Sequence, residues 1–311
     1  MKNALVVGAT GFIGSCLATR LGDSERTVYG ISRSSHAPSF LHNYFSHDIS
    51  DISGFESLLE RIFQEACPME VYFLAGQSDV GRSVLEPLQG LNDTVLPFIT
   101  LLHVANKHDC TVILGSSGSV IGGGVREPGE KQHLLRPKSP YAAAKISCEA
   151  YAVAFNECYS TDVRIARIYS VYGAGLNRMV VYDVIRRIME NPNEVSIRGS
   201  GEQVRDYLYV EDVADALITI AEHGRPGEVY DISSGNPISI LKLTRLIAEV
   251  MGYPDIRIVP DGNSVAGDVD IIAGEMGDMD ELGFKPLINL KEGLHRTVSW
   301  VLSLSGTKVS K

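Results

Sequence analysis

Tyr141 and Lys145 stand four residues apart in a stretch that is predicted to be helical. Residues at this spacing share one face of a helix, so the phenol and the ammonium are expected to lie together. A free tyrosine has a pKa of about 10, and a neighbouring cation favours its phenolate form. Such a tyrosine can exchange a proton with a hydroxyl or carbonyl group. Taken alone, the pattern is also that of an ordinary exposed helix face.

Ser117 adds a third group of suitable chemistry. It follows the expected strand 111–114 and precedes Tyr141 by 24 residues. Its hydroxyl could hold a substrate oxygen while Tyr141 exchanges a proton with that oxygen. The alternative is that Ser116 and Ser117 only satisfy backbone groups in a turn. Together, Ser117, Tyr141 and Lys145 form the candidate catalytic set.

A glycine-rich turn near the N-terminus could bind phosphate. Gly8, Gly11 and Gly14 follow the apolar stretch 4–7 and precede apolar residues at helical spacing. Such a strand, turn and helix start lets the backbone approach an anion at the helix N-terminus. The spacing differs from the dinucleotide fingerprint GxGxxG, and three glycines can also serve helix–strand packing alone.

Strands and helices that could position these groups alternate through the first half of the chain. Expected strands cover residues 4–7, 26–32, 71–75, 111–114 and 162–168, with a short one before 47–49, and expected helices include 55–66, 92–107 and 141–159. This alternation predicts an α/β fold with a doubly wound parallel sheet, which binds ligands at the carboxyl ends of its strands.

The second half is less regular and predicts a smaller lobe. We expect helices at 179–190, 211–223, 241–251 and 290–304, and strands at 206–210, 229–232 and 256–259. The expected domains are a dinucleotide-binding unit at 1–172, to which 206–233 returns, and a substrate lobe from 173–205 and 234–304. Residues 305–311 are expected to form a polar tail.

Composition excludes several classes. The net charge of −10 argues against a nucleic-acid partner, and no apolar stretch approaches the about 18 residues that span a membrane. Five cysteines without CxxC spacing predict reduced, mostly buried thiols and a cytoplasmic protein. The eight histidines form no cluster, so no metal site is expected.

An ordered set of motifs resembles the extended short-chain dehydrogenase/reductase family, which comprises nucleotide-sugar epimerases, dehydratases and 4-keto reductases. The resemblance covers nearly the whole chain. The motifs are GATGFIG at 8–14, HDI at 47–49, LAGQS at 74–78, Asn92, SSGSVIG at 116–122, SPYAAAK at 139–145, RIYSVYG at 167–173, GEQVRD at 201–206 and VEDV at 210–213.

The resemblance implies a Rossmann-type domain, a C-terminal substrate lobe and catalysis by Ser117, Tyr141 and Lys145, with Lys145 also bonding the nicotinamide ribose. It further implies a homodimer that pairs helices 92–107 and 141–159. The implied cofactor contacts are Gly8, Thr10, Gly11, Phe12, Ile13, Gly14, Ser32, Arg33, Ser34, Asp48, Ile49, Leu74, Ala75, Gly76, Gln77, Asn92, Tyr141 and Lys145. The candidate substrate contacts are Gln77, Ser78, Ser119, Ser170, Arg178 and Arg205. For Arg205, a salt bridge to Asp206 is the alternative.

The loop after the second strand bears on the choice of cofactor. NAD-specific relatives carry an acid where this chain has Ser32, and that acid binds the ribose 2′-hydroxyl. Ser32 followed by Arg33 and Ser34 favours a 2′-phosphate, and so NADP(H), with NAD(H) possible. The alternative is a solvated loop with an ordinary arginine.

Other departures from the family pattern bear on the reaction. Dehydratases carry acidic or Ser-Glu pairs directly after the catalytic Ser/Thr, where this chain has Gly118 and Ser119. Because elimination of water needs a general acid and a base there, 4,6-dehydration is disfavoured. Three further family positions have changed, to Ile121, Ser170 and Val265, so substrate contacts could fall to others such as Arg178 or Arg198.

These observations favour an NADP(H)-dependent oxidoreductase that acts at C4 of a nucleotide-activated sugar, as a 4-keto-6-deoxy-sugar reductase does. The main alternative is a C4 epimerase with a tightly held cofactor. Further alternatives are a sugar 4,6-dehydratase and a non-catalytic, cofactor-binding regulator.

Overall fold

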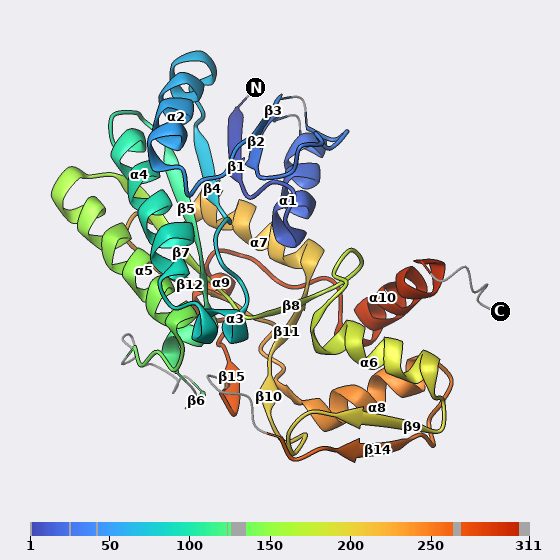
Figure 1. Ribbon diagram of the computed structural model, residues 1–311. Helices are drawn as coiled ribbons and strands as arrows, with labels where there is room; N and C mark the ends of the chain where they lie inside the picture. Colours follow the sequence, from blue (N-terminus) through green and yellow to red (C-terminus); the bar gives the residue numbers. More distant parts are fainter. Residues whose placement is uncertain are drawn as a thin grey trace.

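A seven-stranded parallel sheet forms the centre of the protein, seen as a computed structural model (Figure 1). The structure describes residues 2–24, 26–41, 43–122, 124–125, 135–263 and 269–304. The strand order across the sheet is β3-β2-β1-β4-β5-β7-β12. The strands are β1 (Asn3–Val7), β2 (Thr27–Ser32), β3 (Asn43–Ser46), β4 (Glu70–Phe73), β5 (Thr111–Ser117), β7 (Asp162–Ile168) and β12 (Val229–Ile232).

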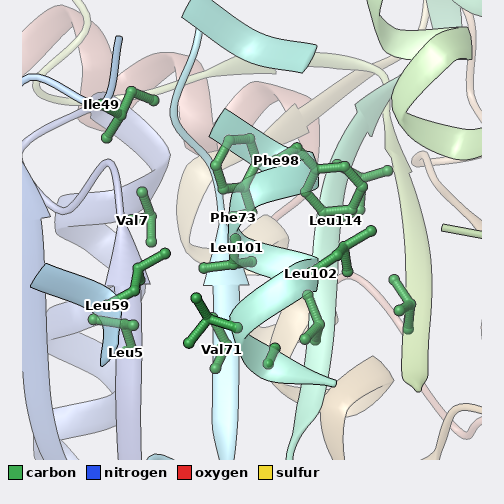
Figure 2. Close-up of a cluster of buried hydrophobic side chains, with 14 of the residues drawn as sticks. Leu5, Val7, Ile49, Leu59, Val71, Phe73, Phe98, Leu101, Leu102 and Leu114 are labelled. Atoms are coloured by element: carbon green, nitrogen blue, oxygen red, sulfur yellow. The ribbon is translucent and has the colours of Figure 1, made fainter. Parts of the chain in front are cut away.

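Helices cover both faces of this sheet. On one face pack α2 (Ile52–Ala66), α4 (Leu96–Ala105) and α5 (Pro140–Tyr159), and on the other α1 (Phe12–Asp23) and α7 (Val210–His223) (Figure 1). Because side chains alternate between the two faces of a strand, Leu5 and Val7 of β1 point to the same face. Both belong to the buried apolar cluster between the sheet and α2, α4 and α5. Figure 2 shows this cluster, in which Leu59, Phe98 and other helical side chains meet the strands.

The strand order confirms the predicted Rossmann-type, doubly wound sheet. β1 lies between β2 and β4, so the chain leaves β1 toward one edge and later returns to its other side at β4. At such a reversal the connections diverge and leave a crevice at the carboxyl ends of the strands. The glycine turn at the end of β1 and Ser117 at the end of β5 both lie at this edge.

The expected helix 92–107 differs in the structure. A short α3 (Val80–Leu85) precedes a π-helical turn, η1 (Leu91–Val95), and α4 begins only at Leu96. Leu96 N–H donates to Leu91 O, which closes the wider turn. Pro97 lacks the N–H that would continue the regular pattern, and a π turn accommodates such a break.

A second lobe has its own core. It packs α6 (Met179–Glu190), α8 (Ile240–Val250) and α10 (Leu290–Leu304) around a third apolar cluster, next to the paired strands β9 (Glu194–Ile197) and β14 (Arg257–Pro260). Residues 305–311, expected to be a polar tail, lie outside the described residues.

Short strands connect the lobe to the main sheet. The expected strand 206–210 is shorter in the structure: it is β11 (Tyr207–Tyr209), and α7 begins at Val210. Buried Asp206 separates it from β10 (Val204–Arg205), and its carboxylate caps another loop. The short strands of this region are β6 (Gly124–Val125), β8 (Ser170–Tyr172), β10 (Val204–Arg205), β11 (Tyr207–Tyr209), β13 (Ile238–Ser239) and β15 (Ile271–Ala273). Helix α9 (Gly277–Glu281) follows β15 in the chain.

All five cysteines are free thiols. Cys110 and Cys148 are buried, whereas Cys67 and Cys158 are exposed at the ends of α2 and α5. The expectation of mostly buried thiols is therefore wrong, because the ends of these helices face solvent. Among the described helices, none has the length and apolar character needed to cross a membrane.

Candidate active site

A cavity of about 990 Å³ lies at the carboxyl ends of the strands, between the sheet and the second lobe. The residues proposed from the sequence as catalytic, cofactor-binding or substrate-binding line it, with the exception of Asn92. Within the described ranges, no group of three or more His, Cys, Asp or Glu side chains is placed to hold a metal ion.

The sequence assigned Asn92 to the cofactor site, and this residue is not among those that line the cavity. Asn92 is exposed on the π-helical turn, whereas its neighbour Asp93 lines the cavity. Thr94 is buried, and its Oγ1 accepts a hydrogen bond from Gln77 N at 3.1 Å. The π-helical turn thus places Thr94 against the backbone of Gln77, while Asn92 is exposed.

The glycine turn has the shape of a phosphate cradle. Gly8 has φ +98°, and a Cβ on Gly14 would lie 2.1 Å from Gly8 O. Gly11 is the N-cap of α1 and supplies no side-chain cap, so the first N–H groups of this helix remain for a ligand. The turn therefore fits the diphosphate of a dinucleotide.

The start of α5 fixes Tyr141 and Lys145. Ser139 caps the helix by accepting a hydrogen bond from Ala142 N at 3.2 Å, and Pro140 begins its first turn. Lys145 is buried, and its Nζ donates to Gly115 O at 2.7 Å. This bond holds the ammonium against the end of β5, one helical turn from the phenol of Tyr141.

Ser117 has a defined hydrogen-bond role. Its Oγ accepts from Ser119 N at 3.2 Å and from Ser119 Oγ at 3.0 Å, at the start of the 3-10 helix η2 (Gly118–Ile121). Ser117 thus satisfies a backbone N–H of this turn, which was the alternative role predicted for it. A hydroxyl has two acceptor lone pairs and one donor proton, so both acceptor positions are used. The proton of Ser117 is left to donate into the cavity that this residue lines.

A buried ion pair lies directly behind this set. Arg167 on β7 donates to Glu149 through Nε at 3.0 Å and Nη2 at 2.7 Å, and Ser116 Oγ donates to the same carboxylate at 2.5 Å. Glu149 is one turn beyond Lys145 on α5. Burial alone lowers the pKa of Arg167, but its bonds to Glu149 raise it above the ordinary value. The network ties α5 to β5 and β7.

The opposite end of the cavity carries polar groups at the ends of β2 and β3. Thr10 Oγ1 and Ser32 Oγ lie 2.7 Å apart. The Asp48 carboxylate has a lowered pKa, first because Ser50 N–H donates to it, and further because Arg33 lies nearby. An anionic Asp48 and a cationic Arg33 therefore stand together where the cavity meets the sheet edge.

The second lobe contributes cations. Arg178, at the start of α6, donates through Nη2 to Ser78 Oγ at 3.0 Å and so bridges the two sides of the cavity. Arg205 donates to Val204 O at 2.8 Å. Val265 lies outside the described residues. The arginines that line this part are Arg178, Arg187, Arg198 and Arg205.

A salt bridge to Asp206 was the alternative role for Arg205, so the surroundings of Asp206 matter here. Asp206 is buried and accepts from Ser234 Oγ at 2.6 Å, Ser234 N at 2.7 Å and Gly235 N at 3.0 Å. The carboxylate thus caps the loop after β12, while Arg205 lines the cavity.

Comparison with known proteins agrees with this geometry. The chain is 30% identical over 318 residues to a dTDP-glucose 4,6-dehydratase of Streptomyces griseus, covering 95% of this chain and 93% of that protein. It is 29% identical to a putative UDP-glucose 4-epimerase of Methanocaldococcus jannaschii, covering 96% and 97%. The crystal structure of a UDP-glucose 4-epimerase with UDP-glucose from Thermotoga maritima is similar, with TM-score 0.87 and 31% identity over 97% of this chain and 99% of that chain.

A family model described as the NAD dependent epimerase/dehydratase family matches residues 4–233. This range begins in β1, contains the glycine turn and the Ser117, Tyr141 and Lys145 set, and ends just after β12. The chain belongs to the NAD-dependent epimerase/dehydratase family and is an enzyme of the extended short-chain dehydrogenase/reductase type.

Proposed function

We propose that this enzyme is an NADPH-dependent reductase that acts on the 4-keto group of a nucleotide-activated deoxy sugar. The proposal rests chiefly on one observation, the hydroxyl arrangement after β5. Ser119 occupies both acceptor positions of Ser117, so Ser117 is oriented as a donor to a substrate oxygen. A ketone oxygen is an acceptor and needs such a donor.

The same turn disfavours dehydration. A Cβ on Gly118 would lie 2.7 Å from Tyr169 Cδ1 and Cε1, so a carboxylate at this position would displace a buried ring. Ser119, which follows, carries a hydroxyl. Elimination of water from the sugar needs an acid and a base beside the catalytic serine, and this turn supplies neither.

Each residue of the set then has one task. Ser117 donates a hydrogen bond to the keto oxygen, and Tyr141 gives that oxygen its proton. Lys145, held at Gly115 O, keeps a positive charge beside the phenol and stabilises the tyrosinate that proton transfer leaves. The nicotinamide, when bound, supplies the reducing equivalent.

Residues at the two ends of the cavity favour the proposed ligands. At the adenosine end, Arg33 with Ser32 and Ser34 favours a phosphate on the ribose 2′-oxygen, because a guanidinium and hydroxyls are phosphate donors. At the other end the arginines of the second lobe, among them Arg178 and Arg205, favour the diphosphate of a nucleotide sugar.

The test uses purified enzyme, NADPH and 4-keto-6-deoxy sugars carried on UDP, dTDP or GDP. We expect one NADPH consumed for each sugar reduced. Tyr141→Phe should abolish turnover and leave NADPH binding, followed by its fluorescence, within about twofold, because only the phenolic oxygen is removed. Reduction at the wild-type rate by this variant would refute the assignment of Tyr141. A wild type that binds NADPH but reduces none of these sugars would instead favour the non-catalytic regulator.

A C4 epimerase is the second candidate, favoured by the overall similarity to UDP-glucose 4-epimerases. It would use the same three residues, first removing and then returning a proton at the C4 oxygen. Interconversion of C4 epimers without added reductant, with no net consumption of NADPH, would establish the epimerase and refute the reductase.

We also propose a homodimer through the outer surface of α3, η1, α4 and α5, which lie side by side on one face of the sheet (Figure 1). Large apolar side chains are exposed there, with Leu85 and Leu88 83% and 72% accessible. Exposed apolar surface of this extent marks an interface. Sedimentation at micromolar concentration should give twice the chain mass, and Leu88→Asp should reduce it to that of one chain. A wild-type monomer would refute the dimer.

A further inference from the structure

Tyr44 is a residue outside the cavity that contacts the loop at its adenosine end. It lies on β3, the edge strand of the sheet, in register with Gly30 of β2. From there its hydroxyl reaches past the end of β2. Tyr44 Oη donates to Ser34 O at 2.7 Å and lies 3.0 Å from Ser32 Oγ.

These contacts extend into a chain of hydroxyl groups. Ser32 Oγ also lies 2.7 Å from Thr10 Oγ1 in the glycine turn. With Tyr44 donating to Ser34 O, Ser32 can donate to Tyr44, and Thr10 can donate to Ser32. These linked hydroxyl groups thus join three segments that are far apart in sequence: the glycine turn, the end of β2 and the edge strand β3.

Arg33 stands between the two residues that Tyr44 holds. Its side chain is exposed and lines the cavity, while the backbone on both sides is tied through Ser32 and Ser34. A long flexible cation binds a phosphate better when its backbone is fixed beforehand, because less conformational freedom is lost on binding. The hydroxyls of Thr10 and Ser32 can also turn toward an anion.

We propose that Tyr44 is a positioning residue that sets the preference for adenosine with a 2′-phosphate over adenosine without one. It acts by holding the Ser32–Ser34 segment so that Arg33 and Ser32 meet that phosphate. This inference rests on the NADPH preference in the proposed function. Asp48 and Ile49, which follow β3, also line this end of the cavity.

The experiment measures binding by calorimetry, without turnover, using two probes: adenosine 2′,5′-bisphosphate and adenosine 5′-monophosphate. Wild type should bind the bisphosphate more tightly. Tyr44→Phe should reduce this preference about five- to tenfold, as expected for lost hydrogen bonds, and leave the affinity for the monophosphate within about twofold. Tyr29→Phe, on the neighbouring strand β2, is the matched control and should leave both affinities unchanged.

Arg33→Ala separates this role from a merely structural one. Because Tyr44 acts mainly through Arg33, Tyr44→Phe should change the preference much less in the Arg33→Ala background than in wild type, so the two effects are not additive. Equal weakening of both probes by Tyr44→Phe, additive effects, or a preference kept intact would overturn the role of Tyr44 alone. A wild type that does not distinguish the probes would overturn the NADPH preference, and the inference with it.

Discussion

Replacing Glu149 by alanine should lower the free energy of unfolding by about 3–5 kcal/mol, because Arg167 would remain buried without its counter-charge. The exposed fractions of the two side chains are 5% for Glu149 and 12% for Arg167, so water can hydrate neither well. Arg167 donates to the carboxylate through Nε, at 3.0 and 3.3 Å, and through Nη2, at 2.7 Å, and Ser116 Oγ donates to it as well. The alanine variant loses all of these hydrogen bonds.

The structure also predicts how the effect divides between charge and packing. Replacing Glu149 and Arg167 together by methionine removes both buried charges and keeps the volume, so the double variant should be more stable than Glu149→Ala by several kcal/mol, about the cost of an unpaired buried charge. The assay is equilibrium unfolding in urea. Each free energy is obtained by linear extrapolation to water.

The matched control is the ion pair Arg186–Glu190 on α6. Its N–O distance is 3.4 Å, and its side chains are 45% and 66% exposed. Glu190→Ala should change the free energy of unfolding by no more than about 0.5 kcal/mol, because solvent screens the pair. If Glu149→Ala were no more costly than this control, or if the single changes at 149 and 167 were additive, the assigned role of the buried pair would be refuted.

Gly14→Ala should weaken NADPH binding at least about tenfold, since the added Cβ would lie 2.1 Å from Gly8 O and open the cradle. The control is Gly22→Ala, which places a methyl group in open space on the same helix. Unchanged binding by Gly14→Ala would contradict the role of the glycine turn in binding phosphate. Iodoacetamide should modify Cys67 and Cys158 first, because burial raises the pKa of Cys110 to about 12 and of Cys148 to about 11; peptide mass mapping that finds Cys148 modified as fast would argue against this packing. Burial raises the pKa of Asp206, so the folded state binds the proton of this carboxyl group more readily than the unfolded state does. Wild type should therefore gain stability relative to Asp206→Asn as the pH falls from neutral toward about 4. Urea unfolding across that range that shows the opposite trend would contradict the assignment.

The sequence by itself predicted the sheet, the glycine turn and the catalytic set because each has a local pattern. Alternating strands and helices determine the fold class, and it was confirmed. Tyr141 and Lys145 share a face because they lie four residues apart on one helix. The residues at strand ends could be assigned to one edge since parallel strands end on the same side of a sheet.

The tertiary structure alone decided which distant side chains meet. The π-helical turn before Pro97 turned Thr94 rather than Asn92 inward, and no local spacing specifies that wider turn. Tyr44 reaches Ser32 only because β3 pairs with β2 in a particular register. Glu149 meets Arg167 through the packing of α5 on β7. Helical and strand periodicity determine which face is buried, but the contacts across that face depend on how the packed elements fit together.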